Sequence, residues 1–246
     1  MRWLHAEWTK HRTLPSTWWL LAATVVLTVA TGAAAASSLT TEVCPTPEAC
    51  HEDTVKLSLS GVWLGQATCL VLGALSMGAE YGTGTVRTTL MAMPVRRRVL
   101  AAKAAALSLL TAATAAVAIP LSLWTASLIL PLRGPTLRAT AGSILILTLV
   151  ALLGLGLTTL LRDTAAGITS GLALLYVVPL LADILASPAW QQRLQRWTPM
   201  PAALSVQATR DLDRLPIAPW PGLGVLAAYA AGLLLAGGVV FAVRDA

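Results

Sequence analysis

Long apolar stretches separated by short polar ones dominate this sequence. Six uncharged runs follow one another along the chain, at residues 13–41, 57–79, 104–132, 139–161, 164–182 and 215–243. Each run supplies the roughly 20 apolar residues that a helix needs to cross a hydrocarbon core of about 30 Å. Leu, Ala and Val fill these runs without the polar–apolar alternation of barrel strands, so helices are predicted.

The pattern predicts an all-α, polytopic membrane protein whose six transmembrane helices form a single domain over residues 1–246. The predicted spans cover approximately residues 16–38, 57–79, 99–130, 139–161, 164–186 and 220–243.

Composition supports a membrane protein. Of the 246 residues, 56% are hydrophobic and 11% are charged, whereas roughly 25% are charged in an average soluble domain. The net charge of +6 alone would suit nucleic acid, but a soluble basic domain is not this poor in charge, so no nucleic-acid partner is expected.

Charge also predicts the orientation. With six spans, both termini lie on one side, which then holds ten of the 17 basic residues and four of the 11 acidic ones. Because Lys and Arg are in excess in cytoplasmic loops, both termini are predicted to be cytoplasmic and the protein to lie in the plasma (inner) membrane.

The first twelve residues, MRWLHAEWTKHR, are basic and contain Trp3 and Trp8. On a helix, the apolar side chains would share one face, which is typical of a short helix lying in the membrane interface and anchored by indole rings. The alternative is a frayed basic tail.

The first external loop contains Cys44 and Cys50. In an oxidising compartment two cysteines this close can form a disulfide; the alternative is two free thiols. Cys69 lies inside the second span, where packing is its simplest role. His51 is near the first two cysteines, but two Cys and one His leave a tetrahedral site incomplete, so no metal site is predicted.

Two further patterns concern helix packing and the last external loop. Gly61-x-x-x-Gly65 and Gly167-x-x-x-Gly171 permit close helix approach, either within one subunit or at a dimer interface. Between spans five and six, tryptophans and arginines alternate with apolar residues, which predicts short interfacial or re-entrant helices broken at Pro199 and Pro201.

The usual catalytic groups are missing from the spans. The three histidines lie outside them, no acid is found at mid-bilayer, and no GxxxxGK[ST] phosphate loop occurs anywhere in the sequence. The chain is therefore not expected to be an enzyme or to bind a cofactor itself.

The longest polar interruption in the first half of the chain is EYGTGTVRTTLMAMPVRRR, residues 80–98. Its glycines permit a turn after span two, and Thr83 or Thr85 can cap a new helix. Residues 86–93 follow with an apolar stripe, and a proline ends the segment. Three arginines then suit anionic head groups; they are Arg96, Arg97 and Arg98. The alternative is an ordinary basic cytoplasmic loop.

EYGTGTVRTTL followed by MPVRRRVLAAK resembles the cytoplasmic coupling segment of ABC-2 type transporter permeases, and AEWTKHRTLPSTWWLLA at residues 6–22 resembles their N-terminal segment. Tyr81 is followed by Gly82, where relatives often have a basic residue. The resemblance implies that the following residues couple the chain to an ATPase subunit: Glu80, Tyr81, Gly84, Thr85, Val86, Arg87, Leu90 and Met93.

The resemblance also implies the function. The chain would be the permease subunit of an ATP-driven exporter that moves an apolar or amphiphilic cargo (a drug, antibiotic, lipid or lipopeptide). Two ABC ATP-binding subunits, which carry the ATP and Mg, and a second permease subunit in a homodimer would be its partners.

Three other functions remain open. A non-transporting sensor, immunity or docking module would bind a cytoplasmic partner through the 80–98 loop. An intramembrane enzyme lacks a base in this sequence, and a proton-coupled carrier lacks a mid-bilayer acid.

Overall fold

The computed structural model describes residues 8–10, 13–42, 53–85, 96–130, 134–185 and 188–243. These residues form helices and turns, and no strand occurs among them. Six helices in the described ranges are long and apolar enough to cross a membrane. For the described residues, the predictions of an all-α chain and of six helices able to span a membrane are therefore confirmed, in keeping with a multi-pass membrane protein.

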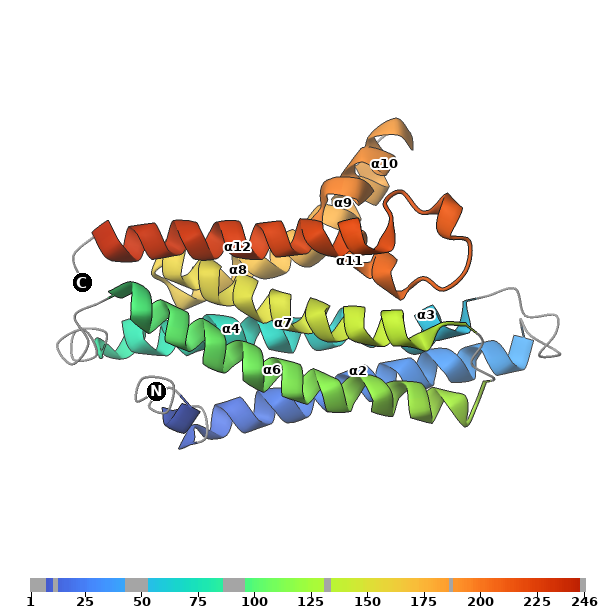
Figure 1. Ribbon diagram of the computed structural model, residues 1–246, viewed down its shortest axis with the longest axis horizontal. Coiled ribbons are helices and arrows are strands. Elements are labelled where there is room, and N and C mark those ends of the chain that lie inside the picture. Colours follow the sequence, from blue (N-terminus) through green and yellow to red (C-terminus); the bar gives the residue numbers. More distant parts are fainter. Residues whose placement is uncertain are drawn as a thin grey trace.

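Five of the six long segments are single helices, and the fifth in chain order is composite (Figure 1). The single helices are α2 (Pro15–Glu42), α4 (Val62–Thr83), α6 (Arg96–Ser127), α7 (Thr136–Leu161) and α12 (Pro219–Val243). The composite segment consists of α8 (Thr164–Leu172), the π-helical turn η1 (Ala173–Val177) and α9 (Val178–Leu185).

Shorter helices connect these segments at one end of the bundle (Figure 1). They are α3 (Thr54–Ser58), α10 (Pro188–Trp197), α11 (Pro199–Leu204) and the 3-10 turns η2 (Ser205–Gln207) and η3 (Leu212–Arg214). Short helices between spans five and six were predicted, and they are present. Pro199 begins α11, where its missing N–H costs nothing, but Pro201 lies within α11 and does not break it.

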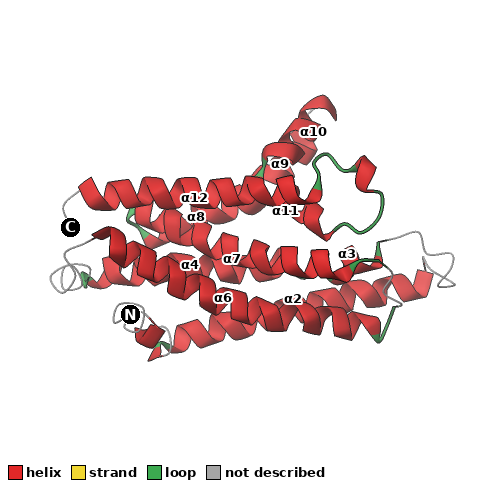
Figure 2. Cartoon of the chain, viewed as in Figure 1, coloured by secondary structure: helices red, strands yellow, loops and turns green. Residues whose placement is uncertain are grey.

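The core of the bundle lies along α4 and α7, whose apolar stretches are the most buried of the six. Figures 1 and 2 show these helices running side by side through the middle of the molecule. A Cβ placed on Gly73 would lie 1.9 Å from the Ala151 carbonyl oxygen, and one on Gly154 would lie 2.3 Å from that of Leu70. Small residues therefore bring the two backbones into direct contact.

The two Gly-x-x-x-Gly patterns also pack inside this subunit. Gly61 and Gly65 of the second span face Thr28 of α2. Gly167 faces Thr158 of α7 and Gly171 faces the Leu70 side chain. These glycines are occupied by neighbours from the same chain, so the packing alternative holds and these positions are not available as a dimer interface.

Exposed tryptophans mark the two ends of the bundle, which we name from the helices. The proximal end is where α2 begins and α12 ends, and the distal end is opposite (Figure 1). Exposed at the proximal end are Trp18 and Trp19, and at the distal end Trp63, Trp124, Trp190, Trp197 and Trp220. Two belts of indole rings separated by apolar helix surface are typical of a protein that spans a bilayer.

The second long helix begins later than predicted. Residues 57–79 were expected to form one span, but α3 and a turn occupy residues 54–61 and α4 runs from Val62 to Thr83. The Asp53 side chain caps α3 by accepting a hydrogen bond of 3.1 Å from the Lys56 N–H. The end of this helix also differs from the prediction. The predicted span ended at residue 79, directly before the charged Glu80, whereas α4 continues by one further turn to Thr83.

Two prolines lie inside long helical segments, where a proline can kink a span. Pro120 is within α6, and Pro179 is the second residue of α9, directly after the π-helical turn η1. A proline removes one backbone hydrogen bond and crowds the preceding turn. A π-helical turn at this point is one of the recognised ways in which a helix accommodates such a disruption.

Candidate functional site at the proximal end

The end of α4 differs from the loop that was predicted there. Glu80, Tyr81 and Gly82 are still helical, so of the two glycines expected to make the turn after span two, Gly82 does not take part. The turn is made at Gly84, whose φ of 70° is left-handed and favours glycine. Thr83 donates to the Ala79 carbonyl oxygen at 2.7 Å, and this bond holds the last turn of α4 together.

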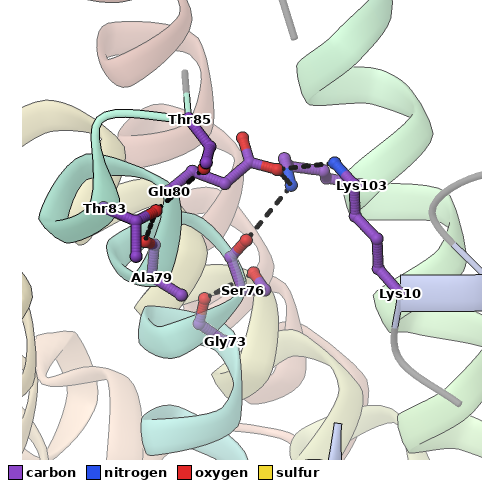
Figure 3. Close-up of polar contacts among 8 residues, drawn as sticks. All are labelled: Lys10, Gly73, Ser76, Ala79, Glu80, Thr83, Thr85 and Lys103. Atoms are coloured by element: carbon purple, nitrogen blue, oxygen red, sulfur yellow. Dashed lines mark hydrogen bonds and ion pairs between the residues drawn. The ribbon is translucent and has the colours of Figure 1, made fainter. Parts of the chain in front are cut away.

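Glu80 lies at the centre of a polar cluster, which we call the Glu80 cluster and which comprises Lys10, Ser76, Glu80 and Lys103 (Figure 3). Glu80 Oε1 accepts hydrogen bonds of 2.7 Å from both Lys103 Nζ and Lys10 Nζ. Lys103 Nζ also donates to the Ser76 carbonyl oxygen at 3.2 Å. One carboxylate oxygen thus connects α4, α6 and the segment that precedes α2.

The two lysines differ sharply in burial. The Lys103 side chain is 2% exposed and that of Glu80 is 10% exposed, whereas that of Lys10 is 44% exposed. A buried ion pair of this kind is expensive to break, because removal of one partner strands the other charge at a cost of about 3–5 kcal/mol. The exposed Lys10 contact contributes about 0–1 kcal/mol. The Lys103–Glu80 pair therefore locks α4 to α6, and Lys10 adds a weaker attachment of the N-terminal segment.

Tyr81 contacts the turn between α7 and α8. The Arg162 guanidinium lies 5.6 Å from the centre of the Tyr81 ring, within cation–π range. Arg162 ends α7 in a left-handed conformation, and Asp163 caps α8 by accepting a 2.7 Å hydrogen bond from the Ala166 N–H. The last turn of α4 is therefore held by α6 on one side and by the α7–α8 turn on the other.

A cavity of about 250 Å³ adjoins the Glu80 cluster. The first turns of α2 and the last turns of α4 form its apolar wall, and the cluster forms its polar wall. In the part of the chain that the structure describes, no group of three or more His, Cys, Asp or Glu side chains is placed to hold a metal.

Many of the predicted coupling residues lie outside the described residues. Glu80, Tyr81, Gly84 and Thr85 are described and lie together at the end of α4. Gly84 and Thr85 are exposed, and Thr85 Oγ1 lies 2.9 Å from Thr83 Oγ1. The others, which fall outside, are Val86, Arg87, Leu90 and Met93.

The predicted anchoring residues are divided in the same way. Arg96 begins α6, and Arg97 and Arg98 follow it with exposed side chains. Trp8 is half-buried in a short helical stretch at residues 8–10. The remaining sites, Trp3, Cys44 and Cys50, lie outside the described residues, so the N-terminal interfacial helix and the disulfide stay predictions.

Sequence reasoning missed Lys103 as the partner of Glu80. It placed Lys103 near the start of the predicted span at residues 99–130 and assigned it no partner. The available signal was the isolation of Lys103 in AAKAAA, five residues after Arg98. At 1.5 Å per residue, that spacing places Lys103 about 7.5 Å deeper along the helix. A lysine inside a span commonly pairs with an acidic side chain.

No protein-family model matches this chain, and no curated protein gives a significant match to it. The function therefore has to be argued from the geometry of the bundle. The informative region is the proximal end, where a buried ion pair joins the two helices that flank residues 86–95.

Proposed function

We propose that the chain is the transmembrane permease subunit of an ATP-driven ABC exporter, in which a separate subunit hydrolyses ATP. The proximal end then faces the cytoplasm, and residues 80–98 form the contact with the ATPase subunit. Both termini are cytoplasmic in this arrangement, in agreement with the excess of basic residues on their side.

The observation that carries the proposal is the Lys103–Glu80 pair. Residues 86–95 lie in sequence between α4 and α6, and the pair connects these two helices at 2.7 Å. A force applied to the connecting segment therefore reaches both helices as one unit. Transport driven by such a force would be a rigid-body repacking of spans between two states.

The cargo and the assembly follow from the same proposal. Apart from Glu80 and Lys103, the buried side chains of the described residues are uncharged and mostly apolar, which suits an apolar or amphiphilic cargo. Two copies of the chain would work with two ATPase subunits, and the pathway would lie where the two copies meet.

Affinity purification from the native membrane in mild detergent tests the proposal. The expected result is a soluble ATP-binding protein that co-purifies in equimolar amount with the chain and hydrolyses ATP faster when cargo is added. Purification of the chain with a cytoplasmic partner that does not hydrolyse ATP would support a docking or sensor module instead. Purification of the chain alone would contradict both.

A further inference from the structure

A second cavity lies at the distal end and has a volume of about 750 Å³. We call it the distal cleft. Its walls come from α2, α3, the start of α4, η2 and the segment around η3. Elements distant in sequence thus form one hollow at the level of the distal tryptophans.

Asp53 holds the segment around Thr209 and Arg210 against the distal cleft. Its carboxylate accepts hydrogen bonds from the Thr209 N–H, from Thr209 Oγ1 at 2.7 Å and from the Arg210 N–H at 3.1 Å, besides the one from Lys56 N–H. The Gln207 side chain, 2% exposed, donates to Ser143 Oγ of α7 at 2.9 Å. The segment that carries Arg210 is therefore held against the cleft by specific bonds.

The charges that line the distal cleft favour one anionic group. Lys56, Arg210 and Arg214 line it together with Asp53 and Asp211, which leaves one formal positive charge. Both Asp53 oxygens are already engaged by donors from the protein. Within the described ranges Lys56 and Arg214 make no ion pair and are exposed, so both cations can bind an anion.

The remaining lining is apolar and held in place. Leu57, Trp63, Leu204 and Leu215 line the distal cleft. The Trp63 ring packs edge-on against Tyr176, with ring centres 4.9 Å apart, and the Tyr176 hydroxyl donates to the Trp63 carbonyl oxygen. An exposed, immobilised indole beside Lys56 and Arg214 is suited to an acyl chain attached to a charged head group.

We propose that the distal cleft binds a membrane lipid with a single anionic head group, whose phosphate lies at Lys56 and Arg214 and whose acyl chain lies along Trp63. Free phosphate shares the head-group chemistry but lacks the chain. This site goes beyond the proposed function, because it requires no ATPase subunit and is present in the chain alone.

Native mass spectrometry of the purified full chain tests the distal cleft with three probes: phosphatidylglycerol, phosphatidylcholine and inorganic phosphate. Phosphatidylglycerol should bind at least about tenfold more tightly than either of the others, since only it provides both contacts. The double variant Lys56→Gln/Arg214→Gln should lose about tenfold in phosphatidylglycerol affinity. The matched control is Arg193→Gln/Arg196→Gln, which removes the same charge from α10 outside the cleft and should stay within about twofold.

Equal losses in the two double variants would overturn the proposal, because attraction would then be a general property of the basic distal surface. Phosphatidylcholine or inorganic phosphate binding as tightly as phosphatidylglycerol would also overturn it. If the cleft variant fails to fold, a photoactivatable phosphatidylglycerol can be applied to the unaltered chain. Crosslinks should then map to the cleft residues, and crosslinks confined to α10 and α12 would contradict the site.

Discussion

Replacement of Lys103 by methionine should destabilise the bundle far more than the same change at Lys10. Both lysines contact the same Glu80 oxygen at 2.7 Å, but Lys103 is 2% exposed and Lys10 is 44% exposed. Breaking a buried pair costs about 3–5 kcal/mol. Because Glu80 keeps its Lys10 contact in the Lys103→Met variant, we expect the lower end, about 3 kcal/mol. Lys10→Met should cost about 0–1 kcal/mol, since the exposed pair is screened by solvent.

The double variant Glu80→Gln/Lys103→Met completes the test. Glu80→Gln alone replaces the carboxylate beside the buried Lys103 ammonium with a neutral amide, so it should cost at least as much as Lys103→Met. The double variant removes both charges, and its cost should be smaller than the sum of the single costs by more than about 1 kcal/mol.

The assay is reversible unfolding in mixed detergent micelles, followed by tryptophan fluorescence, with the free energy of unfolding extracted for each variant. Size-exclusion elution before unfolding controls for insertion and folding. Equal destabilisation by Lys103→Met and Lys10→Met would refute the reasoning, because burial would then not determine the strength of the pair. Additivity in the double variant would refute it as well.

Three further predictions concern Gly82, Gly73 and Asp53, and the first two have a matched control at Gly232. Gly82 lies on an exposed face of α4, and nothing lies within 4 Å of a Cβ added there. Gly82→Trp should therefore leave folding intact but reduce binding of the ATPase subunit at least about tenfold in a pull-down assay. The control Gly232→Trp, at an equally open position in α12, should leave that binding unchanged. Gly73→Val would place its Cβ 1.9 Å from the Ala151 carbonyl oxygen. Because this contact forces α4 and α7 apart, the variant should lower the free energy of unfolding by about 3 kcal/mol. Gly232→Val, where nothing lies within 4 Å, is the control. Burial tends to raise the pKa of Asp53, but hydrogen bonds from its neighbours outweigh burial and lower that pKa. The stability from Asp53 is therefore present above its unfolded pKa of about 3.9 and is lost as pH falls through the lower folded value. Asp53→Asn should flatten this acidic part of the melting-temperature profile, and an unchanged profile would contradict the assignment.

The long apolar runs were sufficient to predict the helices but not all of their ends. Apolar length and the absence of alternation gave six spans, which the structure confirms. The end of the second span was wrong because a charged residue was taken as the end of the helix. Glu80 remains inside α4 because Lys103 neutralises it there, and the isolated position of Lys103 indicates a buried charge without identifying Glu80 as its partner.

Glycine patterns showed a similar limit. The spacing of Gly61 and Gly65 predicted close packing, but a spacing does not identify the partner. The structure identifies it as Thr28 of the same chain. Asp53 is the strongest case: it meets Thr209 from 156 positions away, which no local pattern in the sequence could have predicted.

The Glu80 cluster also changes how the proposed coupling should be tested. Substitution of Glu80 would disturb the buried pair and so would not separate loss of coupling from loss of packing. Exposed positions at the same end are better probes, because their side chains contribute little to the fold. Thr85, directly after the Gly84 turn, is the last described and exposed position before the connecting segment.

Site-specific photocrosslinking in cells at position 85 tests the central claim most directly. A photoreactive residue at position 85 should crosslink an ATP-binding subunit, while the same residue at exposed position 224, near the distal start of α12, should not. Equal crosslinking of that subunit from both positions, or its absence from position 85, would contradict the account.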